Sequence, residues 1–153
     1  MKARDIMTSN PRFCHPQDKL CSAIDIMKET NVGGVPVTDG TSGSHLVGII
    51  TDRDIALGMG AEEKACSQMI VESCMSKDIF FVHPDDDISK VEQIMKEHQV
   101  RRVPVADQEG NLQGIISTAD IAREASKEKK TGHVELPETD VAEVLEQVSM
   151  ERH

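Results

Sequence analysis

The sequence predicts an α/β protein of the α+β type, built from two copies of one β-α-β-β-α unit. The first observation is a repeat: His15-Pro16 recurs in the second half of the chain as His83-Pro84, and Val35-Pro36-Val37 recurs as Val103-Pro104-Val105. The second is that apolar residues follow helical spacing and then strand-like runs, in the same order in both copies. The third is the length of 153 residues, which suits one compact body. A duplicated unit of this size rarely buries its apolar face alone, so we expect the copies to pack together.

Each copy begins with a short extended stretch, Arg12-Phe13-Cys14 or Phe80-Phe81-Val82, that leads into the His-Pro pair. The acidic run Asp85-Asp86-Asp87 fits the first turn of the second copy's helix, where carboxylates oppose the positive end of the helix dipole. Metal binding by this run is the alternative. The helix itself is predicted from apolar residues at helical spacing: Leu20, Ala23, Ile24 and Met27 in the first copy, and Ile88, Val91, Ile94 and Met95 in the second.

Two strands and a second helix complete each copy. The Val-Pro-Val stretch forms the first strand, and its proline suggests an edge or strand-start position. After a turn rich in Asp, Gly and Ser, the apolar runs Leu46–Ile50 and Leu112–Ile116 form strands suited to burial. A helix then begins at Thr51 or Ser117. We expect the first repeat at residues 1–58, a partly helical connector at 59–73, and the second repeat at 74–125.

The tail, residues 126–153, differs in composition from the repeats. Residues 126–130 are polar and basic, and indicate a linker. Pro137-Glu138-Thr139-Asp140 is a typical helix start, and Val141, Val144, Leu145 and Val148 fall on one stripe of the helix that follows. We expect this amphipathic helix to dock on the body of its own chain, with docking on a partner subunit as the alternative.

Composition excludes several classes of partner. A net charge of −10 argues against sequence-independent binding of nucleic acid, and the chain has three Phe and no Tyr or Trp on which bases could stack. No apolar run approaches the ~20 residues that a membrane helix needs. The N-terminal stretch Met1–Asp5 lacks the apolar core of a signal peptide, so a cytoplasmic location is expected.

The cysteines give a weak signal. Cys14, Cys21, Cys66 and Cys74 form no CxxC pair and lie in apolar segments, which favours buried, reduced thiols. A zinc site made of Cys14, His15 and Cys21 is the alternative.

The strongest local motif is Gly-Ile-Ile-Thr-Asp-Arg-Asp at 48–54, repeated as Gly-Ile-Ile-Ser-Thr-Ala-Asp at 114–120. A hydroxyl residue followed three positions later by Asp, where a strand becomes a helix, resembles a capping box. The same geometry suits a ligand, because a helix N-terminus attracts phosphate and a short Asp can accept hydrogen bonds from a ribose diol. Glycine at the start of the motif would let that ligand approach the backbone. A cap can also form one wall of a ligand site.

These two stretches, together with Val-Pro-Val, closely resemble a tandem pair of CBS domains, a Bateman module, over residues 1 to about 125. The resemblance implies two repeats packed about a pseudo-two-fold axis, with two clefts that take adenosine derivatives. The expected ligand is AMP, ADP or ATP, with S-adenosylmethionine or NAD as further candidates, and no cofactor is required. It also implies a homodimer that signals to an unidentified protein target, and no catalytic residues.

By the same resemblance, each cleft joins the late motif of one copy to the residues before Val-Pro-Val in the other. Paired arginines suit phosphate by charge and geometry, so the cleft that holds Arg101 and Arg102 is expected to prefer phosphorylated ligands. Val32, Val35, Val100 and Val103 are candidates to line the adenine slot, with the Thr8 and Ser76 segments at its mouth. The first cleft would use Thr51, Arg53, Asp54, Arg101, Arg102 and Val103, and the second Thr8, Val32, Gly33, Gly34, Val35, Ser117 and Asp120.

The sequence leaves three candidate functions: a regulatory module that senses adenine nucleotides, a structural dimerisation module with empty clefts, and a metal-assisted phosphohydrolase. The last would use Asp52, Asp54 and histidines, but hydrolysis needs a positioned base or a metal cluster. The Asp-x-Asp pair occurs in only one copy, and His15 and His83 precede proline in what we interpret as a structural turn. The regulatory module is the prediction.

Overall fold

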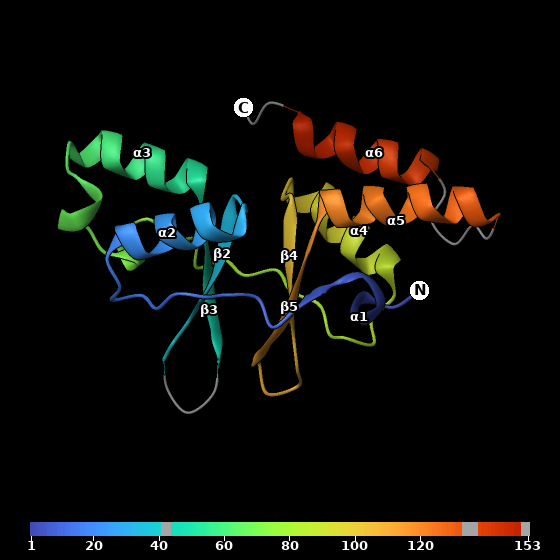
Figure 1. Ribbon diagram of the computed structural model, residues 1–153, viewed down its shortest axis with the longest axis horizontal. Helices are drawn as coiled ribbons and strands as arrows, with labels where there is room; N and C mark the ends of the chain where they lie inside the picture. Colours follow the sequence, from blue (N-terminus) through green and yellow to red (C-terminus); the bar gives the residue numbers. More distant parts are fainter. Residues whose placement is uncertain (41–43, 133–137, 151–153) are drawn as a thin grey trace. The chain divides into compact units, whose positions relative to one another are not determined.

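The structure is a computed structural model that describes residues 1–40, 44–132 and 138–150 (Figure 1). The chain separates into two compact units. The first-repeat unit comprises Pro11–Ile79 and Gln108–Leu112. The second-repeat unit comprises Met1–Asn10, Phe80–Asp107 and Gln113–His153. The N-terminal segment thus belongs with the second copy of the repeat.

The first-repeat unit contains an antiparallel pair of strands, β2 (Gly34–Thr38) and β3 (Leu46–Thr51), with helices α2 (Leu20–Thr30) and α3 (Asp52–Glu62). Two short 3₁₀ helices, η1 (Cys66–Gln68) and η2 (Val71–Ser73), follow α3. Pro36 lies inside β2, opposite Ile49. A proline is tolerated there because β2 is the outer strand of its sheet, flanked on its other side by an isolated bridge between Cys14 and Val37. The core of this unit is formed by Cys14, Leu20, Ala23, Ile26, Val35, Val37, Ile50, Ile55, Met69 and Val71.

The second-repeat unit has a sheet of order β1-β5-β4, made of β1 (Thr8–Ser9), β4 (Arg102–Ala106) and β5 (Leu112–Ser117). Its helices are α1 (Ala3–Ile6), α4 (Ile88–His98), α5 (Thr118–Thr131) and α6 (Glu138–Ser149). Alternate residues of β5 are buried, as in β3, so these strands cover the core with one face. The core residues are Ala3, Val82, Ile88, Val91, Met95, Val103, Val105, Ile116, Ile121, Ala125, Val141, Val144 and Val148.

The segment that precedes each repeat pairs with the late strand of the other repeat. Thr8 of β1 lies opposite Ile115 of β5, and Ser76 forms a bridge with Ile49 of β3. Thr8 and Ser76 occupy equivalent positions, because the alignment that places His15 on His83 also places Thr8 on Ser76. This exchange explains why the N-terminal segment joins the second-repeat unit.

The His-Pro turns are structural, as the sequence suggests. The backbone N–H of His15 donates to Asp18 at 2.8 Å, and that of His83 donates to Asp86 at 2.7 Å. Ring Nδ1 of each histidine lies 2.9 Å from a carbonyl oxygen at the end of the repeat's first strand, that of Thr38 for His15 and that of Ala106 for His83. In both repeats, this histidine ring therefore connects the start of the repeat to its first strand by a hydrogen bond.

The acidic run Asp85-Asp86-Asp87 does not lie in the first turn of a helix, because α4 begins at Ile88. Its carboxylates instead form ion pairs: Asp87 with Lys2 at 2.9 Å, Asp86 with Lys90 at 2.8 Å, and Asp85 with Arg4. Hydrogen bonds from the two lysines lower the pKa of Asp86 and Asp87. Each carboxylate of the run is thus paired with a basic side chain. Among the described residues there is no group of three or more His, Cys, Asp or Glu side chains that could hold a metal ion.

The polar segment at 126–130 is not a linker. Helix α5 continues through it to Thr131, and Gly132 ends the helix in a left-handed conformation. The linker was predicted because the segment is charged, but the helix buries Ala125 and Glu128 in the interior of the unit. Helix α6 then packs on α4 and α5, which confirms docking on the chain's own body. No helix in the described ranges is long and apolar enough to cross a bilayer.

Candidate functional site

The start of α3 carries a complete capping box. The backbone N–H of Thr51 donates to Oδ2 of Asp54 at 2.9 Å, and the N–H of Asp54 donates to Oγ1 of Thr51 at 3.2 Å. The capping interpretation is therefore confirmed. Within the described chain, Oδ1 of Asp54 has no hydrogen-bond partner, so one carboxylate oxygen remains available at a helix N-terminus.

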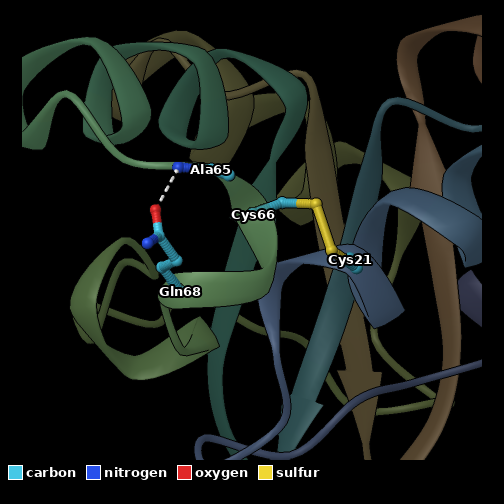
Figure 2. Close-up of a disulfide and its surroundings, with 4 residues drawn as sticks. All are labelled: Cys21, Ala65, Cys66 and Gln68. Atoms are coloured by element: carbon cyan, nitrogen blue, oxygen red, sulfur yellow. Dashed lines mark hydrogen bonds between the residues drawn. A yellow bond between two sulfur atoms is a disulfide. The ribbon is translucent and has the colours of Figure 1, made fainter.

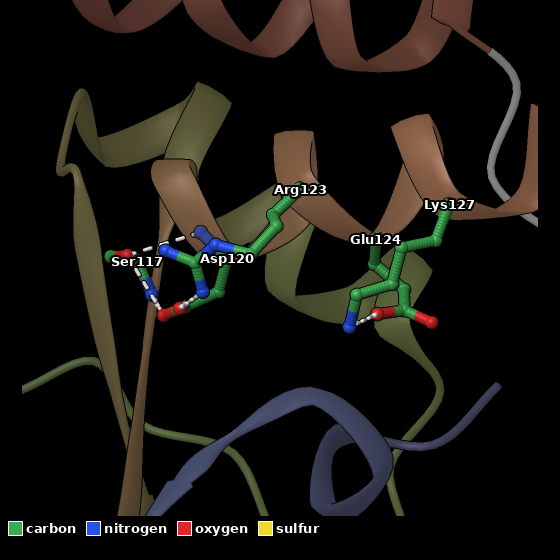
Figure 3. Close-up of polar contacts among 5 residues, drawn as sticks. All are labelled: Ser117, Asp120, Arg123, Glu124 and Lys127. Atoms are coloured by element: carbon green, nitrogen blue, oxygen red, sulfur yellow. Dashed lines mark hydrogen bonds and ion pairs between the residues drawn. The ribbon is translucent and has the colours of Figure 1, made fainter.

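The start of α5 repeats this geometry and adds a cation (Figure 3). The N–H of Ser117 donates to Oδ2 of Asp120 at 2.8 Å, and the N–H of Asp120 donates to Oγ of Ser117 at 3.2 Å. Oδ1 of Asp120 accepts from Nη1 of Arg123 at 3.0 Å. Arg123, one helical turn after the motif, is not among the residues predicted from the sequence. Its i, i+3 spacing from Asp120 was the available signal. In the first copy this position is Leu57, whose side chain is 60% exposed.

Within each unit, the residues before Val-Pro-Val lie beside the start of the late helix. The N–H of Asp52 donates to the carbonyl oxygen of Gly33 at 3.0 Å, and the N–H of Thr118 donates to that of Arg101 at 3.0 Å. The structure thus brings Gly33 to the Thr51 motif and Arg101 to the Ser117 motif. The clefts expected from the family resemblance combine residues of both units, and they stay a prediction.

Two arginines near these helix starts have side chains that make no hydrogen bond or ion pair with the described residues. Arg53 and Arg101 are exposed, and among the described residues neither guanidinium has a hydrogen-bond or ion-pair partner. Arg102 is half-buried at the start of β4. A free guanidinium presents several N–H donors in one plane, which matches the oxygens of a phosphate.

The predicted apolar slot is only partly available. Val35 and Val103 have no exposed surface because both belong to the cores, and Val100 packs against the second core. Core packing therefore accounts for these three side chains. Val32 is 42% exposed, and Thr8 is exposed on β1.

The glycines of the late motif allow a neighbouring backbone segment to approach their strands closely. A Cβ atom on Gly48 would lie 2.7 Å from the carbonyl oxygen of Ser76, and one on Gly114 would lie 3.0 Å from that of Thr8. The exchanged segments therefore take the space at the backbone that we expected a ligand to use.

The cysteine prediction is wrong for two of the four residues. Cys21 of α2 and Cys66 of η1 form a disulfide, with Cα atoms 5.1 Å apart (Figure 2). In the same view, Oε1 of Gln68 accepts from the N–H of Ala65 at 3.1 Å. Cys14 and Cys74 are free, and burial raises the pKa of Cys14 to about 12. Because Cys21 is bonded to Cys66, it is not available as a thiolate for the zinc site considered above.

Comparison with known proteins agrees with this duplicated architecture. The family model described as "CBS domain" matches residues 3–59 and 71–127. The uncharacterized protein YlbB of Bacillus subtilis is 35% identical over 131 residues, covering 86% of this chain and 86% of that protein. The crystal structure of Hypoxic Response Protein I, which has two coordinated zinc ions, has a TM-score of 0.72 and 32% identity, and the match covers 80% of this chain and 98% of that one.

Two further structural neighbours contain adenosine ligands. The CBS domain pair of protein MJ0100, in complex with 5-methylthioadenosine and S-adenosyl-L-methionine, has a TM-score of 0.74 and 26% identity, with 84% of this chain and 98% of that one covered. CBSX2 in complex with AMP has a TM-score of 0.70 and 28% identity, with the same coverage of 84% and 98%. The repeated late motif, the two similar units and these matches agree: the chain belongs to the CBS domain family and carries two CBS domains in tandem.

Proposed function

We propose that this chain is a non-catalytic regulatory module that binds an adenosine nucleotide, AMP, ADP or ATP. The observation that carries the proposal is the duplicated helix start. Both helices have a capped N-terminus. In α3, Asp54 keeps one carboxylate oxygen without a hydrogen bond, and in α5, Asp120 is paired with Arg123. The guanidinium groups of Arg53 and Arg101, which have no hydrogen-bond or ion-pair partner among the described residues, supply positive charge for phosphate. The solved neighbours that hold AMP and S-adenosylmethionine support the same class of ligand.

As ligand contacts we propose the two sets that the family resemblance implies. The first set carries three arginines and is expected to prefer phosphorylated ligands. The second set now has Arg123 beside Asp120, so the difference in charge between the sets is smaller than the sequence alone indicated. The first set is Thr51, Arg53, Asp54, Arg101 and Arg102, and the second is Thr8, Val32, Gly33, Gly34, Ser117 and Asp120. Val103 of the first predicted set and Val35 of the second are fully buried in the cores and are not proposed to touch the ligand.

We further propose that the protein senses cellular energy state as a homodimer and passes the signal to a protein target. Ligand binding would favour one arrangement of the repeats, and the target would bind that arrangement more tightly. The size of such a response depends on the difference in affinity between the two arrangements, not on tight binding alone.

Calorimetric titration of nucleotide-free protein with adenosine, AMP, ADP and ATP tests the proposal. The Arg101→Ala/Arg102→Ala double variant should weaken ATP and ADP binding more than adenosine binding, and the difference should shrink as salt rises. Arg12→Ala is the control for loss of positive charge, because Arg12 is exposed and pairs with Glu29. Equal losses for adenosine and ATP would contradict the phosphate assignment. If none of the four ligands binds, a structural dimerisation module is favoured instead.

A further inference from the structure

The carboxylates of Asp54 and Asp120 hold equivalent positions in the two repeats but have different hydrogen-bond partners. In the second repeat, Oδ2 of Asp120 accepts from the N–H of Ser117 and, at 2.8 Å, also from its hydroxyl. Oδ1 of Asp120 accepts from Nη1 of Arg123 at 3.0 Å. Both carboxylate oxygens and the hydroxyl proton of Ser117 are therefore engaged by α5 and its own cap (Figure 3).

In the first repeat, the same carboxylate is much less engaged. Oδ2 of Asp54 accepts one hydrogen bond, from the N–H of Thr51 at 2.9 Å. Among the described residues, Oδ1 of Asp54 accepts none, and the Thr51 hydroxyl has no acceptor for its proton. The residue three positions after Asp54 is Leu57, which cannot donate a hydrogen bond from its side chain, whereas the residue at that position in the second repeat is Arg123.

This difference matters for a ribose, whose two neighbouring hydroxyls can each donate a hydrogen bond. An ionised carboxylate has about four lone-pair sites, two on each oxygen. Within the described chain, Asp54 uses one of them, whereas Asp120 uses three, two on Oδ2 and one on Oδ1. Asp54 can therefore accept from both hydroxyls as it stands, but Asp120 can do so only after the bond from Arg123 is broken.

The ion pair between Arg123 and Asp120 is weak enough to be displaced. The Arg123 side chain is 65% exposed, against 14% for that of Asp120. Ion pairs whose cation is so exposed contribute little, because water competes for both charges. A ligand can thus break the pair, and the affinity that it loses by doing so cannot exceed the strength of the pair.

We propose that Arg123 is a positioning residue that holds the Asp120 carboxylate in its capping contact and competes with a ribose diol for it. Arg123 thereby lowers the affinity of the Ser117–Asp120 motif for a nucleoside, whereas Leu57 leaves the Thr51–Asp54 motif open. This role rests on the proposed function, in which Asp54 and Asp120 are ligand contacts. Two sites of unequal affinity fill at different ligand concentrations, which widens the range over which the module responds.

Adenosine, titrated by calorimetry against the full chain, is the probe, because it has the ribose but no charge. The Asp54→Ala chain keeps only the Asp120 motif intact. On that chain, Arg123→Leu should tighten adenosine binding about two- to fivefold, the size expected for an exposed ion pair. Arg123→Lys keeps the charge and should give a smaller change. Lys127→Leu is the matched control, because Lys127 is an exposed cation of the same helix that pairs with Glu124 instead (Figure 3), and it should leave binding unchanged.

Two further measurements separate this role from a general effect on the fold. On the Asp120→Ala chain, Arg123→Leu should leave adenosine binding unchanged, because Arg123 acts only through the Asp120 carboxylate. The tightening by Arg123→Leu on the Asp54→Ala chain should also shrink at high salt, because salt screens an exposed ion pair.

The outcomes distinguish this role of Arg123 from the proposed function itself. If the unaltered chain binds neither adenosine nor AMP, the proposed function fails, and the role of Arg123 fails with it. If the unaltered chain binds either ligand, the role alone is overturned when the Asp54→Ala chain binds adenosine equally well, or not at all, with and without Arg123→Leu. It is also overturned when Arg123→Leu has the same effect on the Asp120→Ala chain, because the effect would then come from the helix and not from the carboxylate.

Discussion

At the scale of single residues, Gly48 leaves no room for a side chain, because a Cβ atom would lie 2.7 Å from the carbonyl oxygen of Ser76. Gly48→Ala should therefore lower the free energy of unfolding by about 1–3 kcal/mol, as overpacking against backbone does. Gly60→Ala is the matched control, since nothing lies within 4 Å of the added Cβ and the position is inside α3. It should raise stability by roughly 0.5–1 kcal/mol. Urea unfolding of both variants measures the difference, and a shift in the same direction would contradict it.

Asp54 combines a cap with a proposed ligand contact, and one substitution can separate the two roles. Asp54→Ala should cost about 1 kcal/mol of stability through the lost capping box. It should also weaken nucleotide binding roughly ten- to a hundredfold, since a hydrogen bond to a charged group contributes roughly 1.5–3 kcal/mol. Asp52→Ala controls for charge, because Asp52 is exposed in the same turn. Denaturation and calorimetry are measured on each variant. Lower stability with unchanged affinity would leave Asp54 as a cap only.

Cys14 should make stability depend on alkaline pH. The pKa of its thiol is raised to about 12 by burial, against 9.0 when exposed. Above pH 9 the unfolded chain therefore releases this proton while the folded chain keeps it, and stability falls as pH rises toward 12. The slope from this residue is at most about 1.4 kcal/mol per pH unit. Unfolding free energies from pH 8 to 10.5 should decline more steeply for the unaltered protein than for Cys14→Ala. Parallel curves would refute the assignment.

At the scale of elements, α6 tests how a helix is held. Val144 is buried against α4 and α5, whereas Leu145, the next residue, is 41% exposed although the sequence placed both on one stripe. Val144→Asp should destabilise α6 by about 3 kcal/mol or more, because it buries an unpaired charge. Leu145→Asp should change stability by less than about 0.5 kcal/mol. Hydrogen exchange of the α6 amides reports the difference, and equal protection in both variants would argue against the packing.

The elements also show how far the sequence alone could predict this structure. The helix starts at Thr51 and Ser117 were predictable because a capping box is a local pattern. Strand β1 was not, because so short a strand carries no periodicity and its partner β5 lies in the other half of the chain. The disulfide was missed for the same reason, since Cys21 and Cys66 have a sequence separation of 45. The predicted ligand contacts draw on both repeats, so no local pattern fixes them.

At the scale of the whole molecule, a ligand that binds only the folded protein must stabilise it. At a free nucleotide concentration of about 100 Kd, the gain is about 2.7 kcal/mol, read as a higher Tm by calorimetry. The gain from ATP should fall with the Arg101→Ala/Arg102→Ala variant and with added salt, while the gain from adenosine should not.

Because the module is proposed to be a non-catalytic homodimer, sedimentation equilibrium should give twice the chain mass of 16.8 kDa. ATP should also remain intact over many hours. Hydrolysis that survives repurification would contradict the regulatory assignment, and a monomer at micromolar concentration would require the target to bind a single chain.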